Sequence, residues 1–133
     1  MINAHTSNGS FRVEENGQFE GYADLFDQSD DLSDYVTKAG AFSESLKRHK
    51  ENGTKPAVLG SDNNPIGILE DIQEDERGLY VKGKLVKGLT AYDSLISSAN
   101  TITYCFLPVE AEFDSKSGKN ILMNVDLKAF VIY

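Results

Sequence analysis

The feature that most constrains this fold is the alternation of apolar and polar side chains over short segments bounded by turn residues. Residues 79–85 (LYVKGKL) alternate with period two, which indicates a strand with one buried face. Residues 101–112 are rich in β-branched and aromatic side chains and predict a second strand. Successive side chains of a strand point to opposite faces. One face of this second strand then carries Ile102, Tyr104 and Phe106, and the other carries Thr103, Cys105 and Leu107.

Turn residues divide the rest of the chain into further short elements. An Asn-Gly pair at residues 16–17, between apolar runs at 11–13 and 18–23, predicts a hairpin. Further strands are expected at residues 57–59 and 66–69, and residues 121–127 and 130–133 are expected to make the last one or two strands. Two short helices are expected, over residues 43–50, where Gly53 ends the first, and over residues 90–98.

About six or seven strands without regular helical crossovers favour an antiparallel arrangement over a parallel α/β sheet. The expected fold class is therefore α+β but mainly β: a small, partly closed antiparallel β-barrel or sandwich with a few peripheral helices. The length of 133 residues fits one domain. We expect residues 1–10, which are polar and lack periodicity, to form a flexible or partner-docked arm, and residues 11–133 to form the domain.

Composition excludes several classes of function. The formal net charge of −8 disfavours direct binding of nucleic acid, because phosphate backbones are repelled by an acidic surface. No run approaches the roughly 18 apolar residues of a membrane span, and the N-terminus lacks the pattern of a secretory signal. A soluble protein made in a cytoplasm is expected. With one cysteine, two histidines and no nucleotide-binding motif, neither a metal nor a cofactor is expected.

The residues themselves offer few catalytic candidates. A nucleophile needs a base within hydrogen-bonding reach, and the two histidines are the bases available. His5 lies in the polar arm, and His49 stands among basic neighbours on a helix expected to be solvated. Cys105 lies in an apolar run, which favours a buried, inert thiol over a reactive one. The acidic segment carrying Asp24, Asp27, Asp30, Asp31 and Asp34 is interpreted as a solvated loop, with a Ca²⁺ site as the alternative.

Read in order, six segments resemble the prohead proteases of tailed phages. That family has a segment like G-x-A-S-x-F-D and then, after an acidic stretch, G-A-F at the head of a helix; this chain has GYADLFD at 21–27 and GAFSESL at 40–46. An apolar strand, a His-Asp pair and P-I-G follow in the family, where residues 58–67 are VLGSDNNPIG. The later segments G-L-Y-V-x-G-x-L, G-L-S-I-G-F and D-L-x-E-V-S-L-V correspond to GLYVKGKL at 78–85, TITYCF at 101–106 and DLKAFVIY at 126–133.

The resemblance covers about residues 19–133 and implies a small β-barrel with surrounding helices, shared with herpesvirus assembly proteases. It also implies where a catalytic site would stand, and the residues there depart from the family. Ser61 occupies the place of the histidine base, Thr103 that of the nucleophilic serine, and Ala129 that of the closing acidic residue. Cys105 replaces the glycine after the nucleophile. An alternative site would use Cys105 as nucleophile with His49 as its base.

The leading interpretation is a catalytically inactive prohead-protease domain that acts as a structural or assembly component of a phage head. This interpretation implies that the partner is the major capsid protein or the scaffold protein. The protein is then expected in the virion, after assembly in the host cytoplasm. Self-association into a homo-oligomer is compatible with the same interpretation. One alternative is an active maturation protease with an atypical site. The other is an unrelated β-rich binding module.

Overall fold

The computed structural model describes residues 3–5, 11–28, 34–89 and 91–133, with side chains from residue 11 onward. Within that part of the chain there are nine strands and two helices. In chain order they are β1 (Asn3–His5), β2 (Phe11–Val13), β3 (Gln18–Leu25), β4 (Tyr35–Thr37), α1 (Ser43–Asn52), β5 (Ala57–Leu59), β6 (Pro65–Glu74), β7 (Gly78–Leu85), α2 (Tyr92–Ser98), β8 (Ile102–Asp114) and β9 (Lys119–Ile132).

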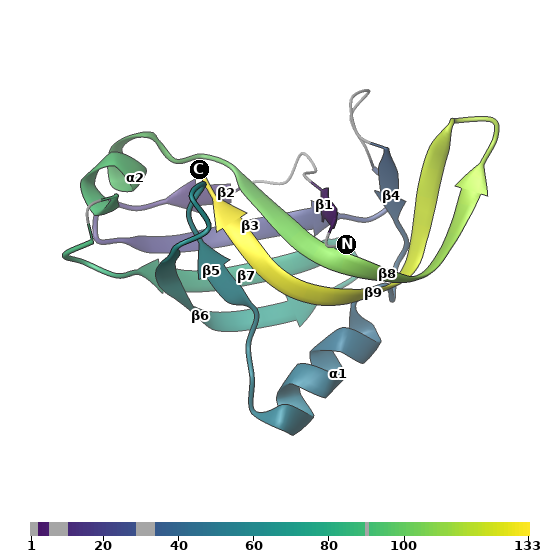
Figure 1. The fold of residues 1–133 in the computed structure, drawn as a ribbon, viewed down its shortest axis with the longest axis horizontal. Coiled ribbons are helices and arrows are strands. Elements are labelled where there is room, and N and C mark those ends of the chain that lie inside the picture. The colour runs from purple at the N-terminus through teal and green to yellow at the C-terminus, as the bar shows by residue number, and fades with distance from the viewer. Residues whose placement is uncertain (1–2, 6–10, 29–33, 90) are drawn as a thin grey trace.

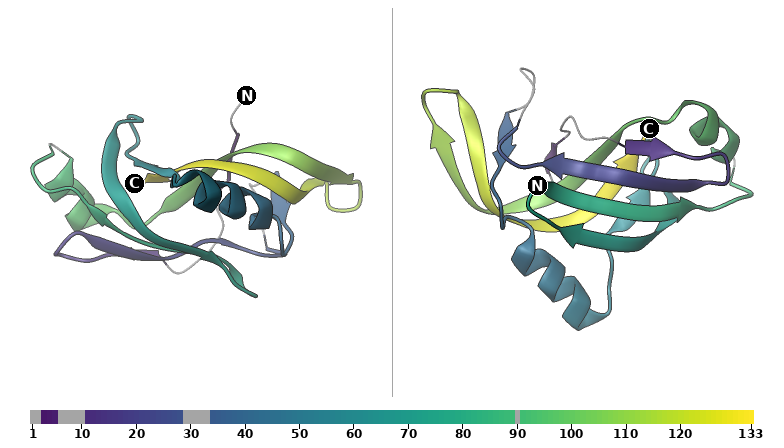
Figure 2. Two further views of the ribbon diagram at one scale, coloured as in Figure 1. Left: turned by 90° about the horizontal axis from the view of Figure 1, so that it is seen from below. Right: turned by 180° about the vertical axis from the view of Figure 1, so that it is seen from behind.

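The strands form one curled sheet in the order β1-β8-β9-β5-β6-β7-β3-β2, with β4 added beside β9. All pairings are antiparallel except those of β4 and β5 with β9, which are parallel. Figure 1 shows the sheet curling around its core, with α1 outside it below β9 and α2 at the end remote from the β8–β9 turn. The two further views in Figure 2 show the same half-barrel. The predicted fold class, mainly β with a partly closed barrel and peripheral helices, is confirmed.

The core lies on the inner face of the sheet and is built around aromatic side chains. Ile102, Tyr104 and Phe106 are at most 3% exposed, so the face division predicted for β8 is confirmed. The ring of Tyr104 lies 5.2 Å from that of Phe42 and 5.1 Å from that of Phe106, measured between centroids. Phe42 precedes α1 and thereby fixes the start of the helix to the core.

Helix α1 covers a gap along the edge of β9. Strand β4 pairs with β9 at residues 120–122 and β5 pairs with it at residues 129–131, which leaves the intervening edge without a strand partner. Side chains of α1 bind the main chain of β9 there in place of a strand. The Leu127 N–H donates to Ser45 Oγ at 2.8 Å, and the Leu127 carbonyl accepts from His49 at 2.9 Å. The helix ends as predicted at Gly53, which has a left-handed φ of 66°.

Three details differ from the sequence-based expectation. Strand β4 was not predicted. Asp24 was placed in a solvated loop, but it belongs to β3 and is fully buried, because β3 continues two residues past the predicted end. Asn3–His5, within the expected arm, pair with residues 104–106 of β8 through their backbone, so these three residues extend the sheet. Asp30 and Asp31 lie outside the described residues.

No helix among the described residues is long and apolar enough to cross a membrane.

Candidate functional site

Two of the three site positions that the family resemblance implies, Thr103 and Ala129, lie on the outer face of the adjacent strands β8 and β9. Thr103 stands opposite Val131 of β9, which in turn stands opposite Leu59 of β5. Two residues along, Cys105 stands opposite Ala129, so the nucleophile position and the closing position lie on adjacent strands. Ser61 follows the end of β5 in the turn that leads to β6. The strand register therefore places Thr103 and Ala129 near each other although they lie 26 residues apart in sequence.

Thr103 is 7% exposed, and its hydroxyl forms a hydrogen bond of 3.1 Å with the hydroxyl of Tyr133. Tyr133 lies two residues beyond Val131, the cross-strand neighbour of Thr103, and therefore on the same face. A tyrosine hydroxyl is a weak base and does not activate a threonine as an imidazole would.

Ser61 and Asp62 stand in a tight turn whose hydrogen bonds are internal. The Asn64 N–H donates to Asp62 Oδ1 at 3.1 Å, and the Asn64 side-chain amide donates to Oδ2 at 2.9 Å. These hydrogen bonds, the backbone one foremost, hold the pKa of Asp62 below its usual value. The carboxylate thus serves to fix the turn, and the neighbouring Ser61 is exposed.

Cys105 is half-buried, and burial raises the pKa of its thiol. A reactive cysteine requires the opposite shift, because the thiolate is the nucleophile. The partner proposed for it, His49, is engaged elsewhere. Its Nε2–H donates to the Leu127 carbonyl at 2.9 Å, so in the neutral ring Nδ1 accepts from the Thr54 hydroxyl, also at 2.9 Å. His49 was expected on a solvated face, but it is partly buried because it binds the main chain of β9.

The raised pKa of Cys105 predicts slow alkylation. Because the folded state disfavours the thiolate, its population stays low until the pH approaches the raised pKa, and then grows. Labelling of the folded protein by iodoacetamide at pH 8 should be several-fold slower than labelling of the urea-unfolded chain. As the pH is raised further, the labelling rate of the folded protein should still increase at pH values where the rate of the unfolded chain has levelled off. Mass spectrometry of timed samples measures both rates. Faster labelling of the folded form would identify Cys105 as an activated thiol.

The second histidine, His5, is placed only by its backbone. It stands opposite Tyr104 in the pairing of β1 with β8, and Ala4 stands opposite Cys105. Sequence reasoning left His5 in an arm, since a three-residue polar strand carries no periodic signal. Among the described residues, no group of three or more histidine, cysteine, aspartate or glutamate side chains is arranged to hold a metal ion.

With this geometry in view, comparison with known proteins gives the family. The family model described as caudovirus prohead serine protease matches residues 6–127. The chain belongs to this family. The match covers most of the sequence and therefore overturns the alternative of an unrelated β-rich binding module.

A relative and a solved structure add detail. The prohead protease of Enterobacteria phage HK97 is 36% identical over 76 residues, which are 54% of this chain and 32% of the relative. The chain thus spans about a third of the length of that curated relative. The structure of the bacteriophage T4 capsid assembly protease matches with a TM-score of 0.70 at 12% identity, covering 98% of this chain and 96% of that chain. The second similarity shows that the two share a fold.

Proposed function

We propose that this member of the prohead protease family is a capsid-associated assembly domain that binds the major capsid protein or the scaffold protein without cleaving it. One observation carries the proposal. The three site positions hold two hydroxyls and a methyl group, on Ser61, Thr103 and Ala129. None of these groups titrates near neutral pH, so none acts as the general base that a hydroxyl nucleophile requires.

The family and its named relatives support the choice of partner. The relatives are called a prohead protease and a capsid assembly protease, names that place them at the assembling phage head. A protease fold already recognises the proteins that it cuts. A protease that loses its catalytic groups can still bind these proteins, because the contacts that bind the substrate are separate from those that stabilise the transition state. The protein would accordingly reside in the prohead, and self-association there is compatible with the proposal.

The alternative is an active maturation protease with an atypical site. It is favoured by the 36% identity to a relative named as a protease. In this alternative Thr103 or Cys105 attacks the scissile carbonyl, and a group other than Ser61 or Ala129 takes the proton. The raised pKa of Cys105 and the engaged ring of His49 count against one form of it.

A co-expression experiment separates the two. The full chain is expressed with its cognate major capsid and scaffold proteins, and intact masses of all three are measured before and after assembly. We expect uncut partners, with this protein recovered in stoichiometric amounts in purified particles. Shortened capsid or scaffold protein whose shortening disappears with Thr103→Ala or Cys105→Ala would overturn the proposal, while loss with Ser97→Ala, an exposed control on α2, would indicate a folding effect.

A further inference from the structure

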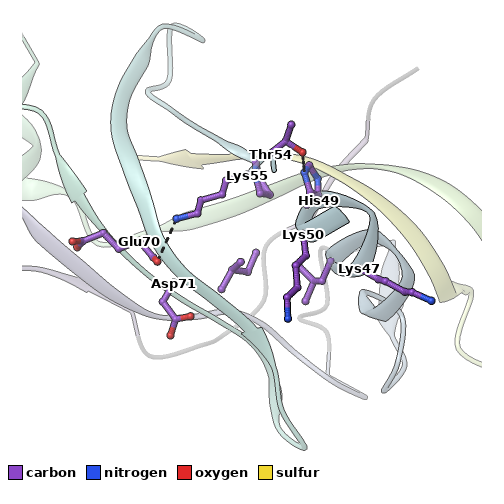
Figure 3. Close-up of a pocket in the computed structure, with 10 residues that line it drawn as sticks. Lys47, His49, Lys50, Thr54, Lys55, Glu70 and Asp71 are labelled. Atoms are coloured by element: carbon purple, nitrogen blue, oxygen red, sulfur yellow. Dashed lines mark hydrogen bonds between the residues drawn. The ribbon is translucent and has the colours of Figure 1, made fainter. Parts of the chain in front are cut away.

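A groove lies between α1 and β6, at the end of β5 opposite to the degenerate site. Its volume is about 440 Å³, and its floor includes the apolar side chains of Leu46, Pro56 and Ile72. Pro56 immediately precedes β5, whereas Ser61 follows that strand, so the groove and the site are separated by the length of β5. Figure 3 shows α1 and the segment around Lys55 on one side of the groove and Glu70 and Asp71 of β6 on the other.

The β6 side of this groove is an open strand edge. Strand β6 pairs with β7 over residues 67–74, except at Glu70, where the register shifts between Leu69 and Asp71. Strand β5 pairs with β6 only at Pro65 and Gly67. Among the described residues, no strand therefore occupies the second edge of β6 from residue 68 onward. Lys55 Nζ donates to the Leu69 carbonyl at 3.1 Å and approaches the Glu70 carbonyl at 3.5 Å. A flexible ammonium group thus covers carbonyls that a neighbouring strand would otherwise bind.

The groove also gathers positive charge in an acidic protein. The chain has a net charge of −8, yet Lys47, Lys50 and Lys55 all line this one groove. Neither Lys50 nor Lys55 forms an ion pair with a carboxylate in the part of the chain that the structure describes. In Figure 3 the ammonium group of Lys50 extends from α1 alongside the groove, while that of Lys47 points away from β6.

We propose that the groove binds an extended acidic peptide segment of a partner protein, which adds to β6 as a further strand. Main-chain N–H groups of the peptide bond the carbonyls of Leu69 and Glu70 in place of Lys55 Nζ. Alternate side chains then point to the apolar floor, and a carboxylate meets the ammonium groups of Lys50 and Lys55. The proposal is independent of whether Thr103 cleaves anything.

A strand fits these features better than a nucleic acid or a free anion. An open strand edge binds the main chain of a peptide, which nucleic acid lacks. The apolar floor contributes nothing to a free anion but stabilises an apolar side chain.

The test uses the full chain and a fluorescein-labelled, end-blocked peptide of about eight residues in which glutamates alternate with valines or threonines. Fluorescence anisotropy measures binding, and amide chemical shifts locate it. We expect shifts concentrated in residues 68–73, and binding about tenfold weaker for the double variant Lys50→Glu/Lys55→Glu. Lys47→Glu is the matched control on the same helix and should change binding less. N-methylation of alternate peptide groups should also weaken binding, since it removes the donors.

Three results would overturn the proposal. The first is equal binding of a peptide in which lysines replace the glutamates, which removes charge complementarity. The second is shifts that map elsewhere on the protein. The third is displacement of the peptide by inorganic phosphate or by oligothymidylate at a similar concentration, which would make the groove an anion or nucleic-acid site. Both lysines are exposed, so their replacement should leave stability nearly unchanged. Circular dichroism of each variant checks that it is folded.

Discussion

Replacing Phe106 with alanine should lower the free energy of unfolding by about 3–5 kcal/mol, because the substitution removes a large buried ring and leaves a cavity. Phe106 is fully buried and lies in the first half of β8. Its ring packs against that of Tyr104 at 5.1 Å and meets that of Tyr35 edge-on at 5.4 Å. Tyr35 belongs to β4, so the cavity also weakens the attachment of that strand to the sheet. A fall in Tm of roughly 10–20 °C corresponds to this loss.

The same strand supplies a matched control. Phe113 is 66% exposed, and Phe113→Ala removes the same number of atoms from the surface rather than from the core. Its effect should lie within about 0.5 kcal/mol. Urea unfolding followed by circular dichroism measures both variants, and the midpoint and slope are compared. Equal losses for the two positions would mean that the exposed part of the β8–β9 hairpin is buried in an assembly of the protein in solution.

Prediction from sequence succeeded where a side-chain pattern is local. The alternation in residues 101–112 gave the two faces of β8, and the Asn-Gly pair gave the hairpin of β2 and β3. In β8 the periodicity that identifies the strand also decides which of its sides is buried.

It failed where a segment is placed by distant partners. Strand β4 is three residues long and exists because its backbone pairs in parallel with residues 120–122 of β9. Aspartate is more common in loops than in strands, yet Asp24 belongs to β3 and is buried in the core. The burial of Tyr104, and next the charge of Asp24, raise the pKa of that tyrosine well above its usual value, so the two side chains act on each other across strands. No short-range pattern reports such contacts.

The candidate site stands between these cases. Composition and spacing alone did not connect Ser61, Thr103 and Ala129, and only the family resemblance proposed them as one site. The strand register then supplied the reason that Thr103 and Ala129 are neighbours. Neither a local pattern nor the family resemblance indicated the groove between α1 and β6. Its two sides come from a helix and a strand edge whose residues are common in such elements.

Gly78→Ala should be the most damaging of the small substitutions, with a loss of about 4 kcal/mol or more. A Cβ built on Gly78 would lie 2.0 Å from the carbonyl oxygen of Asp24 and 2.9 Å from the Cα of Leu25. Both are backbone atoms of β3, so relief requires the two strands to separate beside a fully buried carboxyl group. Gly83, the other glycine of the same segment, is somewhat less confined, with the Ile68 carbonyl oxygen and the Phe19 ring both 2.4 Å from its built Cβ.

Gly88→Ala is the comparison that isolates this overlap. Gly88 has a left-handed φ of 88° but nothing within 4 Å of its built Cβ, so its substitution carries backbone strain alone, about 1–2 kcal/mol. Chemical denaturation of both variants should therefore show a difference of at least about 2 kcal/mol. If the two losses are similar, β7 and β3 separate easily at this point, and the glycine at the head of the GLYVKGKL segment serves something other than close strand packing. A large difference would give a physical reason for the first glycine of the GLYVKGKL segment: at Gly78 the backbone of β7 lies too close to β3 to admit a side chain.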